Sequence, residues 1–266
     1  MEAYSDFASV YDELMDSTPY EDWKRRILKD IRELGISKPY RAARDPLESE
    51  RNLVLDLACG TGTLTELLYR EGYDMIGVDS SDAMLAKAME KRDVSGSEIL
   101  YLQQDMRELE LYCTVGTVIS VCDSLNYLLA EEELKDTFGL VHNYLYPGGL
   151  FLFDVNTDHK YRDVIGEATI AENREDCSFI WENYYDTEEG INEYDVTIYM
   201  QEENGLYRRF EETHFQKGYD EATIRRLLEE TGFELLRIID SDTETEVTEE
   251  TERIYVAARC IKDSEK

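Results

Sequence analysis

The chain has 266 residues, and its 42% hydrophobic and 11% aromatic content is sufficient for a packed core. Its formal net charge of −32 argues against a nucleic acid partner or an anionic membrane surface, because no surplus of Lys and Arg exists to displace counterions. We expect a cytoplasmic protein: the N-terminus has no basic signal-peptide region, the cysteines show no paired CxxC spacing, and no apolar run approaches the ~18 residues of a membrane span.

The first part of the chain is predicted to be mainly helical. Apolar residues recur at helical spacing over the first 15 residues. A second helix is predicted to begin with Thr18 as its N-cap and Pro19 in its first turn, and to end at Gly35. Residues 37–51 are polar and contain two prolines, so we expect a loop there.

From residue 52 the chain alternates short apolar runs with amphipathic ones. The predicted strands are "NLVLDLA", "DMIGVDS", "ILYLQQD", "GTVISVCD" and "LFLFDVN". The predicted helices between them are "LTELLYREG", "SDAMLAKAMEKR" and "EEELKDTFGLVHNYLYPGG". This alternation predicts a parallel sheet that is covered by helices on both faces, with the carboxyl ends of its strands at one edge.

After residue 165 apolar and aromatic residues alternate with polar ones, which predicts an inserted antiparallel sheet. Asn204-Gly205 and Glu189-Gly190 are the expected hairpin turns. The α/β pattern then resumes with a helix "DEATIRRLLEETG" and a strand "FELLRIID". An acidic linker leads to a last strand "RIYVAARC", which we expect to pair antiparallel with the strand before the linker.

An aspartate ends each of the five predicted parallel strands: Asp56, Asp79, Asp105, Asp123 and Asp154. They should line the edge where open α/β sheets bind ligands. A dinucleotide is a poor fit, because Asp56 would repel its phosphates and Thr65 stands where GxGxxG requires a third glycine. S-adenosylmethionine fits better, because it carries a sulfonium and an ammonium and has no phosphate.

The run "VLDLACGTG" resembles the first motif of the Rossmann-like S-adenosylmethionine-dependent methyltransferases, and the resemblance continues through "GVDSSDAML", "LQQDMREL", "CDSLNYL" and "PGGLFLFDVN". "YSDFASVYDELM" and "LYRRFEETHFQ" are similar to a bacterial small-molecule branch that resembles the glycine and amino-sugar N-methyltransferases. The resemblance implies an α/β fold with a seven-stranded, mostly parallel sheet. It also implies four parts: a helical lid (1–50), a cofactor-binding core (51–165), an inserted sheet over the acceptor site (166–218) and a final helix with two strands (219–266).

The resemblance implies a set of cofactor-binding residues: Tyr11, Asp56, Ala58, Gly60, Gly62, Asp79, Ser80, Met84, Asp105, Met106 and Cys122. In this family the equivalent of Asp79 takes the ribose hydroxyls, that of Asp105 the adenine amino group, and the Ala58 carbonyl the ammonium. Structural alternatives stay open for several members. Asp56 would equally cap the amides of the turn, Tyr11 and Met84 would serve helix packing or the core, and Cys122 would be a buried apolar thiol.

Four residues are candidates for holding or activating the acceptor. Asp123, Asn126 and Tyr127 follow the fourth strand, and His159 follows the fifth. We interpret His214 as a structural sheet histidine, which by alternation shares a face with Glu212 and Gln216. Asp123, Asp154 and Asn156 depart from the spacing of the magnesium site in catechol-type methyltransferases, so no metal is expected.

The functional hypothesis is a methyltransferase that moves a methyl group from S-adenosylmethionine to a small-molecule nitrogen or oxygen nucleophile by in-line displacement. The product would be S-adenosylhomocysteine. Two alternatives stay open: an NAD(P)-dependent oxidoreductase, which Thr65 disfavours, and a non-catalytic protein that binds S-adenosylmethionine. The sequence decides neither the acceptor nor the oligomeric state.

Overall fold

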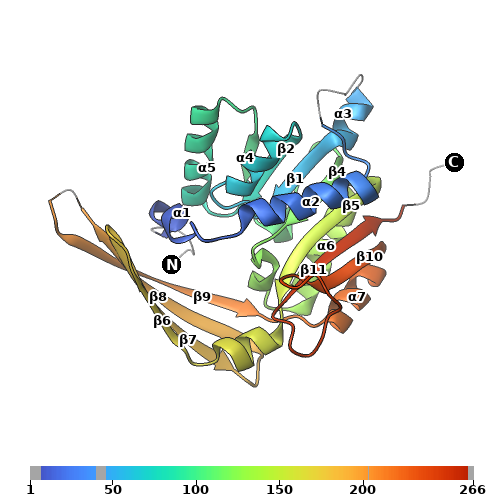
Figure 1. Cartoon of the computed structure of the whole chain (residues 1–266). Coiled ribbons are helices and arrows are strands. Elements are labelled where there is room, and N and C mark those ends of the chain that lie inside the picture. Colours follow the sequence, from blue (N-terminus) through green and yellow to red (C-terminus); the bar gives the residue numbers. More distant parts are fainter. Residues whose placement is uncertain (1–6, 40–45, 203, 263–266) are drawn as a thin grey trace.

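The computed structural model describes residues 7–39, 46–202 and 204–262 (Figure 1). Seven strands form one sheet in the order β10-β11-β5-β4-β1-β2-β3. The strands are β1 (Leu53–Leu57), β2 (Asp74–Asp79), β3 (Leu100–Gln103), β4 (Val115–Ser120), β5 (Leu145–Asn156), β10 (Phe233–Asp240) and β11 (Arg253–Cys260). Strands β1 to β5 are parallel, and β11 runs antiparallel to both β5 and β10. The predicted mostly parallel sheet with an antiparallel last strand is confirmed.

Helices cover both faces of this sheet. On one face lie α2 (Tyr20–Leu34), α4 (Thr63–Arg70) and α5 (Asp82–Ser95), and on the other lie α6 (Glu131–Tyr144) and α7 (Glu221–Glu230). The sequence forms α6 because Leu134, Phe138 and Val141 recur at helical spacing and are fully buried against the sheet. Strand order reverses between β1 and β4, which makes the carboxyl ends of these strands the expected ligand site.

Several local expectations differ from the structure. Helix α2 begins at Tyr20 without a side-chain cap, because its N-cap residue is Pro19, which has no polar side chain, rather than the predicted Thr18. The predicted loop 37–51 contains helix α3 (Pro46–Asn52), which opens on a proline at a position where a missing amide costs no hydrogen bond. The first predicted helix is reduced to a 3-10 turn η1 (Phe7–Ser9) and α1 (Tyr11–Leu14), while residues 1–6 and 40–45 lie outside the described residues.

A second sheet has four antiparallel strands in the order β6-β7-β8-β9. They are β6 (Thr169–Asn173), β7 (Cys177–Asp186), β8 (Ile191–Gln201) and β9 (Tyr207–Lys217). Both predicted hairpin connections are present, and the sheet extends beside the N-terminal segment in Figure 1. Its inner face packs Tyr194, Val196 and Ile198 against Val10 and the partly buried Leu14. The division of the chain into the four parts stays a prediction.

Three short helices follow strands β3, β4 and β5, at the edge where the parallel strands end. They are η3 (Met106–Glu108), η4 (Ser124–Tyr127) and a π-helix η5 (Lys160–Ile165), which the sequence patterns did not predict. None of the helices in the described part of the chain has the length and apolar character needed to cross a membrane.

Candidate active site

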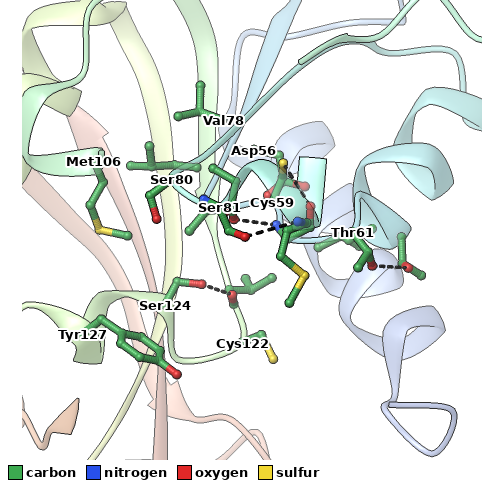
Figure 2. A pocket seen from close by; sticks show the side chains of 18 of the residues that line it. Asp56, Cys59, Thr61, Val78, Ser80, Ser81, Met106, Cys122, Ser124 and Tyr127 are labelled. Atoms are coloured by element: carbon green, nitrogen blue, oxygen red, sulfur yellow. Dashed lines mark hydrogen bonds between the residues drawn. The ribbon is translucent and has the colours of Figure 1, made fainter. Parts of the chain in front are cut away.

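A cavity of about 480 Å³ lies at the carboxyl ends of β1, β2, β3 and β4. This volume is in the range of small-molecule and cofactor sites. In the view of Figure 2, Met106 and Tyr127 lie on one side of the cavity and Thr61 on the opposite side. The predicted cofactor residues that line it are Tyr11, Asp56, Ala58, Gly60, Asp79, Ser80, Met84, Asp105, Met106 and Cys122. One predicted residue, Gly62, does not line it.

The turn after β1 is held by Asp79 at the end of β2. The Gly60 amide donates to Asp79 Oδ2 at 2.8 Å, and the Ser81 amide donates to Oδ1 at 2.9 Å. Burial raises the pKa of the Asp79 carboxyl. Gly60 has a φ of +54°, and an added Cβ there would meet only open space. The backbone of the turn therefore lies open to a ligand.

Gly62 has a different reason for being a glycine. A Cβ at this position would lie 2.4 Å from the Tyr101 hydroxyl, and the residue has a φ of +71° at the start of α4. Close packing against β3, rather than contact with a ligand, therefore requires this glycine.

Asp56 is 2% exposed and lies beneath the turn. Its Oδ2 accepts a hydrogen bond from the Thr65 hydroxyl at 2.6 Å. Burial raises the pKa of Asp56 to about 7. The expectation that Asp56 caps the amides of the turn is not met at Gly60, because Asp79 accepts from that amide.

The end of β3 contributes Asp105 and Met106 to the cavity. Asp105 caps η3 by accepting from the Arg107 amide at 2.9 Å, and its carboxylate also pairs with the Arg107 guanidinium at 2.6 Å. The hydrogen bonds from Arg107 lower the pKa of Asp105, so this carboxylate stays ionised. Arg107 also lines the cavity and was not predicted.

The loop after β4 has unusual backbone geometry. Cys122 and Asp123 both have positive φ, at 65° and 51°, as does Ala58 after β1 at 62°. Such strain persists where the surroundings impose it and is common at functional sites. Here Asp154 imposes it, because its two carboxylate oxygens accept from the amides of Cys122 at 3.2 Å and Asp123 at 2.8 Å.

All five strand-end aspartates lie at the carboxyl edge of the sheet, as expected, but they do not all line the cavity. Asp56, Asp79 and Asp105 line the cavity, while Asp123 and Asp154 do not. The Arg253 guanidinium lies 2.7 Å from Asp123 and 3.2 Å from Asp154. These two carboxylates thus share one cation from β11 within the protein.

Among the predicted acceptor residues, Tyr127 lines the cavity and the other three do not. Asn126 is fully buried, and its amide nitrogen donates to the backbone carbonyls of Asn156 and Lys217. His159 is half-buried and directly precedes η5, and its Nδ1 is 3.0 Å from Asp163 Oδ2. Asn126 therefore joins the ends of β5 and β9, and His159 pairs with a residue of η5.

The lining of the cavity fits S-adenosylmethionine. Carboxylates suit its sulfonium and ammonium, and the open backbone at Gly60 permits close approach. Two of the carboxylates, Asp56 and Asp79, flank the turn where a dinucleotide would bring its phosphates. This donor set matches a cationic, phosphate-free nucleoside.

Comparison with known proteins agrees with this assignment. Residues 54–149 match the model of a methyltransferase domain. The chain is 36% identical over 262 residues to the putative methyltransferase YqeM of Bacillus subtilis, covering 97% of this chain and 98% of that protein. A solved S-adenosylmethionine-dependent methyltransferase from Clostridium acetobutylicum has a TM-score of 0.83 and 27% identity, with 98% of this chain and all of that chain covered. The chain belongs to the S-adenosylmethionine-dependent methyltransferases.

The cofactor of this methyltransferase is S-adenosylmethionine, and the oxidoreductase alternative is wrong. The Rossmann-like fold is shared with Streptomyces venezuelae DesVI, which has a TM-score of 0.72 at 19% identity. Thr65, the departure from the dinucleotide fingerprint, supplies the hydroxyl that holds Asp56 in this methyltransferase.

The N-terminal segment of the methyltransferase is fastened to the glycine turn by an ion pair. Lys91 Nζ on α5 lies 2.6 Å from Asp12 Oδ2 on α1. The same Lys91 nitrogen donates to the hydroxyls of Thr61 and Thr63, and Asp12 Oδ1 accepts from Thr61 at 2.6 Å. This ion pair and these hydrogen bonds hold α1, and with it Tyr11, over the cavity.

Sequence reasoning missed several lining residues of the methyltransferase. Trp23 on α2 lines the cavity, and so does Tyr20, which the sequence alone did not separate from ordinary helix packing. Thr61, Gln104 and Ser124 also line it. Gln104 and Ser124 directly neighbour a strand-end aspartate in the sequence, which is the signal that would have found them.

Proposed function

We propose that this methyltransferase transfers its methyl group to a nitrogen or oxygen atom of a small molecule. Support comes from relatives named as N-methyltransferases. One, an amino-sugar N,N-dimethyltransferase of Streptomyces venezuelae, is 30% identical over 132 residues, which cover 47% of this chain and 54% of that protein. Another, a glycine/sarcosine N-methyltransferase of Halorhodospira halochloris, is 28% identical over 190 residues, covering 68% of this chain and 65% of that protein.

The observation that carries the proposed cofactor site is the acidic lining around an open glycine turn. In this proposal Asp79 binds the ribose hydroxyls, since its carboxylate is fixed by two backbone amides at the mouth of the cavity. Asp56 attracts the ammonium through the dry base of the turn, and the Ala58 carbonyl accepts from it. Asp105 is proposed to accept from the adenine amino group, although its carboxylate already accepts a hydrogen bond from Arg107.

Met84, Met106 and Ser80 complete the proposed nucleoside site, and Cys122 lies under its methionyl end. When bound, S-adenosylmethionine supplies an electrophilic methyl group on a sulfonium. The chain itself contributes position and exclusion of water: Tyr11 and Tyr20 line the cavity from the N-terminal segment, and the inserted sheet contacts the lining residue Tyr127 through Tyr194 and His214. Tyr127 is the proposed contact of the acceptor.

A thermal-shift titration tests the cofactor site. S-adenosylhomocysteine should stabilise the protein by about 2.7 kcal/mol at roughly a hundred times its Kd, and NADH should not. A panel of amines, alcohols and carboxylates is then incubated with S-adenosylmethionine, and S-adenosylhomocysteine is quantified. Absence of stabilisation by S-adenosylhomocysteine would refute the proposed site, and release of S-adenosylhomocysteine with no member of the panel would refute a small-molecule nitrogen or oxygen acceptor.

A further inference from the structure

A second polar cluster lies on strand β9 of the inserted sheet. Glu212 and His214 on β9 are 3% and 2% exposed, so a carboxylate and an imidazole are both removed from water. They share one face of the sheet, and that face is turned toward η4 of the core. Burial of polar groups of this kind destabilises the folded state unless the groups are paired.

Tyr127 connects this cluster to the cavity. Its hydroxyl lies 3.1 Å from His214 Nδ1 and 2.8 Å from the Tyr194 hydroxyl. The same side chain lines the cavity, and its hydroxyl end is turned toward the side of Cys122 in Figure 2. Tyr127 is therefore the one predicted acceptor residue that reaches both the cavity and the buried histidine among the described residues.

The second ring nitrogen of His214 faces a carboxylate. His214 Nε2 lies 3.4 Å from Glu212 Oε2, while Glu212 Oε1 accepts from the Phe7 amide at 3.0 Å. A carboxylate at this position favours the tautomer with the proton on Nε2. The lone pair of Nδ1 then points at the Tyr127 hydroxyl, which donates to it.

The ring of His214 is also fixed in place. It stacks on Tyr194 with a centroid distance of 5.0 Å and an interplanar angle of 13°. Phe7 and Tyr127 approach its ring in edge contacts at 6.5 Å and 5.9 Å. Three polar groups of the described residues face His214: the carboxylate of Glu212 and the phenol groups of Tyr127 and Tyr194.

From this geometry we propose that Tyr127, His214 and Glu212 form a proton relay that deprotonates the methyl acceptor. The inference rests on the proposed function and narrows its substrate class. The acceptor is an amine or alcohol that arrives with a proton on the attacking atom, and not a carboxylate. Tyr127 touches the acceptor, whereas His214 and Glu212 act through Tyr127 as positioning residues.

The proposed step needs no further reactant, because every proton and electron pair in it has a donor and an acceptor. The acceptor proton passes to the Tyr127 oxygen while the Tyr127 proton passes to His214 Nδ1, and the resulting imidazolium is stabilised by the Glu212 carboxylate. The freed lone pair of the acceptor forms the new bond to the methyl carbon. The carbon–sulfur bond breaks with its electron pair left on sulfur, which gives a neutral thioether.

The first test reads the tautomer directly. The chain has three histidines, so ¹⁵N-histidine labelling of the full protein saturated with S-adenosylhomocysteine gives a spectrum that single substitutions can assign. His214 is expected to carry its proton on Nε2 at pH 8. Glu212→Gln should give a mixture of tautomers, and Tyr127→Phe should shift the Nδ1 signal. Asp163→Asn, which alters the surface partner of His159, is the matched control and should leave His214 unchanged.

The second test separates a relay from a structural contact. Glu212→Gln keeps an acceptor for the Phe7 amide and should lower kcat about a hundredfold with an amine or alcohol probe. KM for the probe and affinity for S-adenosylhomocysteine should change less than about twofold, because the Glu212 side chain touches neither ligand. Tyr127→Phe should also lower kcat.

Any of three results would overturn the relay: a proton on Nδ1 of His214, full kcat in Glu212→Gln, or turnover of no amine or alcohol probe. If S-adenosylhomocysteine does not bind at all, the proposed function fails, and that outcome is distinct from each of these.

Discussion

Thr65 donates a hydrogen bond from its hydroxyl to Asp56 Oδ2 at 2.6 Å, and both side chains are buried. Thr65 is the residue that replaces the third glycine of the dinucleotide fingerprint. The residue that departs from that motif and the aspartate beneath the turn thus contact each other directly. This contact holds a carboxylate under a cationic cofactor at a place where a dinucleotide fold accommodates phosphates.

Asp56 should make stability depend on pH in the absence of cofactor. Its folded-state pKa is raised from 3.8 to about 7, so the folded protein holds this proton more tightly than the unfolded chain does. Below pH 4 this proton makes its full contribution to the free energy of unfolding. The contribution, on the order of 4 kcal/mol, is lost as the pH rises from 4 to 7. Urea unfolding of the wild type and Asp56→Asn at pH 4.5 and about pH 8 measures this difference.

In that experiment Asp56→Asn reports the pH response of the rest of the chain, because an amide cannot ionise at this position. The free energy of unfolding of the wild type, taken relative to that of the variant, should be lower at about pH 8 than at pH 4.5. An equal pH response of both proteins would show that Asp56 does not titrate in this window.

Asp79→Asn should weaken binding of S-adenosylhomocysteine by at least about tenfold, because the amide loses the charge that we propose binds the ribose hydroxyls. Isothermal titration calorimetry gives the affinity. Asp74→Asn is the matched control, since Asp74 begins the same strand that Asp79 ends and lies at the opposite edge of the sheet. Equal losses in the two variants would mean that the effect comes from global destabilisation.

Lys91→Gln should loosen the N-terminal segment, because the side chain loses its ion pair with Asp12. We expect faster proteolysis near α1 and a dissociation rate of S-adenosylhomocysteine raised about threefold or more. Limited proteolysis and stopped-flow measurements report the two effects. Lys87→Gln on the same helix breaks only an exposed pair with Glu90 and should change neither. A normal dissociation rate in Lys91→Gln would argue against α1 as a cover of the cavity.

Arg253→Met should destabilise the protein by about 3–5 kcal/mol, because it leaves Asp123 and the buried Asp154 without their cation. Chemical denaturation measures the change. Arg259→Met, on the same strand, removes a pair with Glu234 in which both side chains are partly exposed, and should cost about 1 kcal/mol or less. Similar losses in both variants would contradict the assigned role of Arg253.

The strands and most helices could be predicted because their signals are local. Val54 and Leu55 in β1 and the helical spacing of Leu134, Phe138 and Val141 in α6 each reveal buried faces within a short window. The motifs around Gly60 and Asp79 likewise lie at fixed distances from strand ends, so their place at the cavity followed from topology. Helix α3 was missed because its proline and its charges are typical of a loop.

Other features depend on residues that are distant in the sequence. Arg253 neutralises Asp154 from a strand that pairs beside β5, and no local pattern distinguishes Asp154 from Asp79. Asn126 appeared to be an acceptor contact until the ends of β5 and β9 proved to occupy its hydrogen bonds. The alternation correctly placed His214 in the inserted sheet on one face with Glu212 and Gln216, but its contact with Tyr127 spans 87 residues of sequence.

By itself the sequence determined the order of strands and helices and the acidic, phosphate-excluding character of the glycine turn, because periodicity and motif spacing are properties of contiguous residues. Only the tertiary structure decided which carboxylates face the cavity, because the cation that pairs with both Asp123 and Asp154 arrives from β11 near the end of the chain. It also brought Glu212 and His214 against Tyr127, since packing of the second sheet on the core is set by burial and shape over the whole molecule.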